Sequence, residues 1–150
     1  MGARCAVSAD FDGDGLQDLV SASSNDNAVS WFRNLGGNPP SFSIKKKITW
    51  NSLGSRIVTV GDVDGDGDMD VVGASYYDSS LRWFENDGKG VFTEHLISSA
   101  VNEGQGVILA DLDSELYDDF CMCFGEFNVL THTHTHCTTS TSIQFSHFVV

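Results

Sequence analysis

Two short acidic stretches of the sequence have the residue types and the spacing of a metal-binding loop. Residues 10–18 read DFDGDGLQD, and residues 62–70 read DVDGDGDMD. Both stretches place acidic side chains at alternate positions, with glycines between them. Carboxylates crowded in this way raise one another's pKa, whereas a bound cation neutralises them. Calcium, which prefers about six to eight oxygen ligands in a flexible shell, fits this pattern best.

The candidate side-chain ligands stand at equivalent positions of the two loops. They are Asp10, Asp12, Asp14 and Asp18 in the first loop, and Asp62, Asp64, Asp66 and Asp70 in the second. The glycines permit the positive φ angles that curl a tight loop. An EF-hand would need a glutamate where Ser21 and Gly73 stand, and flanking helices as well. Magnesium fits less well because it prefers a small octahedral shell, and zinc prefers nitrogen or sulfur ligands.

The two loops belong to a longer internal repeat. With Gly2 aligned to Gly54, residues 2–34 and 54–86 match without a gap, and nearly half of the aligned positions are identical. Each full copy reads as four short strands, because runs rich in Val, Ile, Tyr, Trp and Phe alternate with turn residues. In the second copy the expected strands are residues 56–63, 70–77, 80–86 and 91–98. Four strands in each repeat are typical of a β-propeller blade, and a β-sandwich would leave the repeat unexplained.

The predicted fold is therefore all-β, a partial β-propeller of about two and a half four-stranded blades. A third, degenerate copy lacks the loop glycines but keeps acids in the same register, namely Asp111, Asp113, Glu115 and Asp119. We divide the chain into repeat 1 (2–53), repeat 2 (54–102), a partial repeat 3 (103–124) and a low-complexity tail (125–150) that we expect to stand apart from the fold.

The loop DxDGDGxxD, the following WFxN and a GxGxF-like turn together resemble the FG-GAP/VCBS repeats, the blades of integrin-α-type β-propellers. The resemblance covers residues 2–124. It implies that each loop joins the first two strands of a blade and binds calcium, with the backbone of Leu16 and of Asp68 as further ligands. It also implies a third site, made of Asp111, Asp113, Glu115, the backbone of Tyr117, and Asp119. Because propellers of this family usually have about seven blades, the chain would be a fragment, an open partial propeller or part of an assembly.

Other chemistry-bearing residues are interpreted as structural. Trp31 and Trp83 recur at the same repeat position, so we expect them in the core rather than in a sugar-stacking platform. Trp50 lies outside the motif and is a better candidate for an exposed contact. The tail contains THTHTHC, which could bind zinc or copper, but the low-complexity interpretation is favoured because no second ligand cluster supports a metal site. Our hypothesis is that the tail is read-through from non-coding sequence in a truncated gene model.

The composition limits the classes of partner. The formal net charge is −13, from 21 acidic and 8 basic residues. Such a chain repels phosphate backbones and anionic lipid, so we expect no nucleic-acid partner. No stretch approaches the roughly 20 apolar residues of a membrane span, and the N-terminus has no apolar run typical of a signal peptide. The four cysteines show no zinc-site spacing.

We expect a non-catalytic module, stabilised by calcium, that binds or adheres to protein or carbohydrate outside the cell or at its surface. The location is inferred from the family and from the weak calcium affinities, roughly 10⁻⁴–10⁻³ M as a Kd, of extracellular modules. Self-assembly or additional blades would complete a propeller. One alternative is a fragment of a calcium-dependent polysaccharide lyase, but the only histidine within the matched repeats is His95, expected on a surface strand. The other alternative is a truncated gene model with no independent function.

Overall fold

The computed structural model describes residues 2–49, 51–101, 106–110, 120–125, 128–132 and 145–148. Within these ranges the chain forms twelve strands and no helix. No helix in the described part of the chain is long and apolar enough to cross a membrane. The all-β prediction is therefore confirmed.

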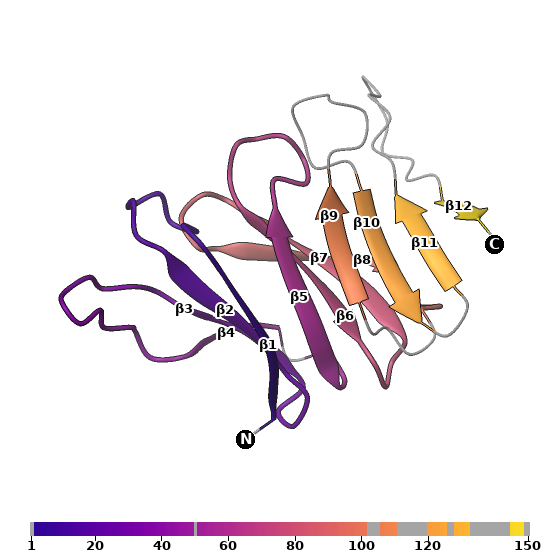
Figure 1. The fold of residues 1–150 in the computed structure, drawn as a ribbon, viewed down its shortest axis with the longest axis horizontal. Coiled ribbons are helices and arrows are strands. Elements are labelled where there is room, and N and C mark those ends of the chain that lie inside the picture. Colours follow the sequence, from indigo (N-terminus) through magenta and orange to yellow (C-terminus); the bar gives the residue numbers. More distant parts are fainter. Residues whose placement is uncertain are drawn as a thin grey trace.

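The strands form three four-stranded antiparallel sheets, and each sheet pairs its strands in chain order (Figure 1). The first sheet contains β1 (Ala3–Ala9), β2 (Asp18–Ser23), β3 (Ala28–Phe32) and β4 (Lys46–Thr49). The second contains β5 (Ser55–Gly61), β6 (Asp70–Ser75), β7 (Ser80–Asn86) and β8 (Phe92–Ser98). The third contains β9 (Gly106–Ala110), β10 (Phe120–Gly125), β11 (Asn128–His132) and β12 (Phe145–Phe148). Each sheet has the strand order of a propeller blade, as the repeat predicts.

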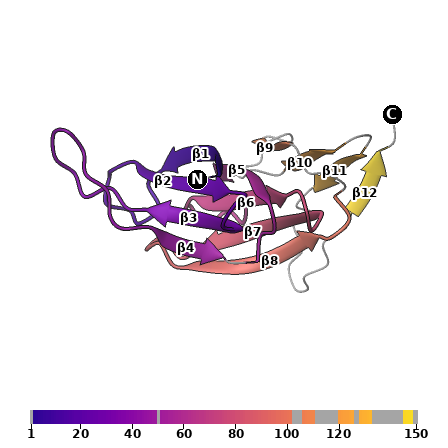
Figure 2. The ribbon, with the colours of Figure 1, turned by 90° about the horizontal axis from the view of Figure 1, so that it is seen from below.

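The first two blades share their irregularities as well as their strand order. The register shifts between Ala3 and Cys5 where β1 pairs with β2, and between Ser55 and Ile57 where β5 pairs with β6. These positions are equivalent in the aligned repeats. Figure 2 shows the strands of both blades following one another in the same direction, from β1 to β4 and from β5 to β8. The two copies of the sequence therefore fold into the same backbone, with the same bulge.

The apolar core lies between the blades. One buried cluster draws on the first two blades and contains Ala9, Phe11, Val20, Ala22, Val29, Trp31, Val58, Val71 and Phe84. The other draws on the second and third blades and contains Val63, Val72, Ala74, Leu81, Val101 and Val107. Every residue of β6 is buried, and its alternating side chains reach both clusters, Val71 the first and Val72 the second. The second blade is therefore packed on both of its faces.

The first blade has one uncovered face. Leu19 in β2 is 36% exposed, whereas Val71, its equivalent in β6, is fully buried. The difference follows from neighbours rather than from residue type, because nothing in the described structure packs on that face of the first blade. An open row of blades of this kind is the expected partial propeller.

Two findings differ from the sequence-based expectations. The strands β11 and β12 lie within residues 125–150, which we expected to stand apart from the fold, yet they pair with β10 and with each other in the third sheet. Both are short runs with apolar, strand-favouring residues, NVLTH and FSHF. In the core, Trp31 is buried as predicted, and Trp83 packs against the second core cluster but is only half-buried. Trp50 lies outside the described residues.

Candidate metal centres

Each acidic loop connects the first two strands of a blade, β1 to β2 and β5 to β6. The first acid of each loop folds the loop around itself by accepting backbone N–H groups. Asp10 Oδ2 accepts from Gly15 N at 2.7 Å, and Asp62 Oδ2 accepts from Gly67 N at 3.0 Å. These glycines have φ of +83° and +92°, a conformation that strains other residues. The glycines of the motif therefore let each loop fold around its first acid.

The last acid of each loop is fully buried and anchors the loop to the third strand of its blade. Asp18 accepts hydrogen bonds from Trp31 Nε1 at 2.9 Å and from Asn34 N at 2.6 Å. Asp70 accepts from Asn86 N at 2.8 Å. Burial raises the pKa of Asp70 to about 6, although hydrogen bonds from backbone N–H groups lower it in part. Within the described part of the chain, no basic side chain forms an ion pair with this buried acid.

The acids gather into two clusters that could hold a metal ion. One carboxylate oxygen from each member lies within 4.8 Å of the others in two groups, one of Asp10, Asp12 and Asp18 and one of Asp62, Asp64 and Asp70. The donor set consists only of carboxylate oxygens, which suits a hard cation such as calcium. Asp14 and Asp66, which the sequence predicts as further ligands, lie outside these two groups. The third predicted site, Asp111, Asp113, Glu115, Tyr117 and Asp119, lies outside the described residues.

A basic side chain from outside the motif forms ion pairs with acids of the first loop. Arg33, which follows β3, forms ion pairs with Asp12 through Nε and with Asp14 through Nη2, the latter at 3.0 Å. The Asp12 side chain is only 8% exposed, and its Oδ1 is buried without a hydrogen-bond partner. The arginine therefore offsets charge in this loop but leaves one buried ligand oxygen free for a cation.

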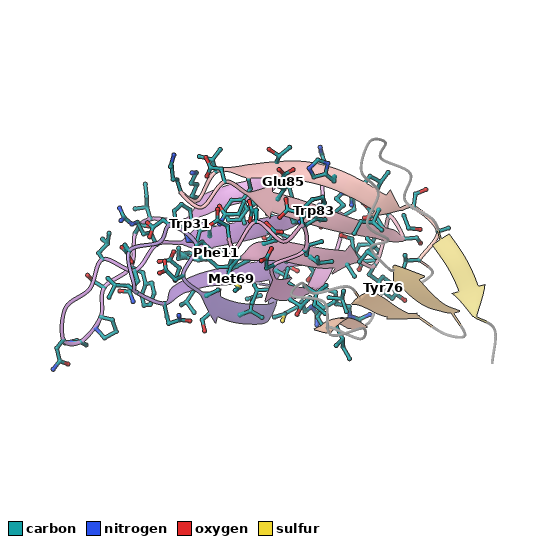
Figure 3. All side chains as sticks on the ribbon, turned by 90° about the horizontal axis from the view of Figure 1, so that it is seen from above. Phe11, Trp31, Met69, Tyr76, Trp83 and Glu85 are labelled. Atoms are coloured by element: carbon teal, nitrogen blue, oxygen red, sulfur yellow. The ribbon has the colours of Figure 1, made fainter. Side chains whose placement is uncertain are left out.

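The second loop has an acid at the equivalent position. Glu85 takes the place of Arg33 in the aligned repeats, and it projects from β7 on the same side as Trp83 (Figure 3). Burial raises the pKa of Asp64, and the charges of Asp66 and Glu85 raise it further. Among the described residues, no basic side chain forms an ion pair with an acid of this loop.

Both loops lie at the boundary with the following blade. Phe11, in the first loop, packs edge-on against Phe92 of β8 with ring centroids 5.8 Å apart, and its carbonyl accepts a hydrogen bond from Asn86 Nδ2 at 2.9 Å. Val63, at the equivalent position of the second loop, belongs to the core cluster that includes Val107 of β9. Each loop therefore contributes one apolar side chain to the packing between blades.

The family model of the FG-GAP-like repeat matches residues 10–73 and, a second time, residues 62–122. This chain belongs to the FG-GAP-like repeat family. Each match begins at the first acid of one loop and continues past the next, so the FG-GAP-like unit contains the joint between two blades as well as a blade. A search of curated proteins found no match to the chain.

Sequence reasoning found the acids of these FG-GAP-like repeats but missed the residues that distinguish one loop from the other. Arg33 and Glu85 are visible in the gap-free alignment as a reversal of charge at one position, and that signal could have identified them. The bond from Asn86 to the first loop joins residues far apart in the sequence and needed the structure to be seen.

Proposed function

We propose that this FG-GAP-like chain is a non-catalytic calcium-binding module that acts outside the cell or at its surface and binds protein or carbohydrate. The observation that carries the calcium proposal is the pair of all-carboxylate clusters, each located where one blade meets the next. A cation bound there would relieve the repulsion among the acids and hold together the strands that the loop connects.

Calcium, rather than magnesium, is supported by the shape of the loops. Their acids come from a flexible, glycine-rich backbone, and calcium accepts irregular shells of about six to eight oxygens. Such loops in extracellular modules bind calcium with a Kd of roughly 10⁻⁴–10⁻³ M, which matches the calcium available outside cells.

The proposal that the module is non-catalytic is supported by the surroundings of His95 on β8. Its ring stacks on Trp83 with centroids 4.6 Å apart, and its Nε2 lies 2.7 Å from Glu85 Oε2. Both contacts hold the histidine against its own sheet. Incubation with acidic polysaccharides should therefore release no unsaturated product detectable by ultraviolet absorbance, and release of such a product would favour the lyase alternative.

The test of calcium binding is a thermal melt followed by circular dichroism, with calcium, with magnesium and with excess chelator. Calcium at about a hundred times its Kd should stabilise the fold by about 2.7 kcal/mol per site, because it binds the native state alone. For a chain of this length each filled site should raise the Tm by about 5–10 °C, and magnesium should raise it less. The double variant Asp62→Asn/Asp64→Asn is the control, and it should lose the second loop's part of the shift while keeping the part that comes from the first loop. An equal Tm with calcium and with chelator would refute calcium binding.

A further inference from the structure

The two loops differ in the charge of one neighbouring residue. Where β2 pairs with β3, Leu19 lies opposite Phe32, and where β6 pairs with β7, Val71 lies opposite Phe84. The next residue along each third strand is therefore placed beside the last acid of its loop. In the first blade this residue is an arginine and in the second it is a glutamate.

We propose that Arg33 is a tethered cation that competes with calcium for the first loop, so that the second loop fills at lower calcium concentration than the first. This inference rests on the proposed function, that the loops bind calcium. The two loops would then fill over different ranges of calcium concentration. The charge of the residue at the position of Arg33 and Glu85 would determine that difference.

The charges near each loop support this order of filling. The first loop has four acids, and Arg33 offsets one of their charges through ion pairs with Asp12 and Asp14. The second loop has five acids, and Glu85, whose Oε2 lies 2.7 Å from His95 Nε2, still raises the pKa of Asp64 by its charge. Lys89 lies close enough to Asp68 to lower its pKa, but it is the smallest of the contributions there and forms no ion pair with the loop. A divalent cation is therefore attracted more strongly to the second loop.

The geometry of Arg33 indicates competition rather than a permanent block. Its side chain is 46% exposed, so the guanidinium can move into solvent without crossing the core. Calcium entering the first loop would gain the free Oδ1 of Asp12 but would have to displace the arginine from Asp12 and Asp14. Because arginine stays protonated throughout the physiological range, this competition would not depend on pH there.

The test is a calcium titration of the full chain by isothermal calorimetry. Asp64→Asn assigns the step of the second loop, and Asp12→Asn assigns the step of the first. Any binding by the third predicted loop is common to all of these proteins, so it cancels when they are compared. The titration of the wild type should show a tighter and a weaker calcium-binding step. Asp64→Asn should remove the tighter step, and Asp12→Asn should remove the weaker one.

The deciding variant is Arg33→Gln, which should move the step of the first loop to a calcium concentration about tenfold lower, because one opposing charge is removed. The matched control is Arg56→Gln, which makes the same change in net charge. Arg56 lies near the start of β5, where its guanidinium stacks on Tyr76 at 4.8 Å, whereas the second loop follows the end of that strand. It should leave both steps in place.

The mirror variant Glu85→Arg keeps the inference testable if Arg33→Gln does not fold. It should move the step of the second loop to a calcium concentration at least about tenfold higher. Coincident steps for both loops in the wild type, or unchanged steps in Arg33→Gln and Glu85→Arg, would overturn the inference while leaving calcium binding intact. The absence of any calcium step in every protein would instead refute the proposed function.

Discussion

The loops of the first and second blades have the same backbone and different neighbours. In both, glycines with positive φ curl the chain, the first acid accepts backbone N–H groups, and the last acid is buried against the third strand. The surroundings then diverge, because Arg33 pairs with the first loop and Glu85 stands beside the second. A repeated motif therefore fixes the shape of a loop, while single residues outside the motif set its charge.

The same contrast extends to the joints between blades. Phe11 fills the first joint with an aromatic ring, and the smaller Val63 takes its place in the second. Asn86 ties its own blade to the first loop through Phe11. The predictions that follow compare equivalent residues of the two blades.

The largest effect is expected from removing the aromatic ring at the first joint. Phe11→Ala should lower the free energy of unfolding by about 3–5 kcal/mol, because the ring is fully buried and packs against Phe92. The matched variant Val63→Ala removes two buried methyl groups and should cost only about 1–2 kcal/mol. Both values would come from urea denaturation at one fixed calcium concentration. Similar losses in the two variants would mean that the joints do not differ in the way their residues suggest.

The equivalent residues Asn34, just after β3, and Asn86, the last residue of β7, should also differ, with the larger loss of stability again at the first joint but with smaller values. Asn86 is buried, and its Nδ2 donates to Phe11 O at 2.9 Å across the joint and to Met69 O at 3.1 Å within its blade. Asn34 is only half-buried, and its Nδ2 donates to Gln17 O at 3.0 Å within its own blade.

Asn86→Ala should therefore cost about 1–3 kcal/mol, because it leaves buried carbonyl groups without donors. Asn34→Ala should cost about 0.5–1.5 kcal/mol, because its partners can turn to water. Urea denaturation measures both. In addition, Asn86→Ala should weaken calcium binding at the first loop, whereas equal effects of the two variants on that loop would argue against a link across the joint.

Much of this architecture could be predicted from the sequence because the repeat carries it. The strands expected at residues 56–63, 70–77, 80–86 and 91–98 correspond to β5–β8, with ends that differ by no more than two residues. Alternating apolar residues and the glycine-rich turns are local signals, and they were sufficient for the blades and for the positions of the loops. Of the acids predicted as ligands in each loop, three have carboxylate oxygens close enough together to hold one metal ion.

The rest depended on contacts between segments that are distant in the sequence. Trp31 and Trp83 differ in burial although they share a repeat position, because Trp31 packs against Phe92 of the next blade whereas Trp83 stacks on His95 of its own sheet. The pairing of Arg33 with the first loop requires β3 to lie beside β2 in one particular register. The exposed Leu19 reflects the absence of a neighbouring blade on that face in the described structure. Each depends on which surfaces meet, and local patterns do not specify that.

The smallest effect concerns the turn between the second and third strands, at the end of each blade away from the loops. Asp26 forms an ion pair with Lys45 of the first blade, and Lys47 Nζ lies 3.9 Å from its Oδ2. The hydrogen bond from Lys45 is the main cause that lowers the pKa of Asp26 to about 2 from an ordinary value of 3.8. In the second blade the equivalent Asp78 pairs instead with Arg82 at 2.9 Å.

Asp26→Asn should cost less than about 1 kcal/mol, because the Asp26 side chain is 35% exposed and solvent screens the pair. The folded state holds the charged form more strongly than the unfolded state does, so the stabilisation is present above about pH 4 and disappears as the pH falls toward about 2. The measurement is the difference in unfolding free energy between wild type and variant at several pH values, in which the titrations of other groups cancel. Added salt should shrink the difference above pH 4, whereas a difference that stays constant down to about pH 2 would show that the ion pair is not its source.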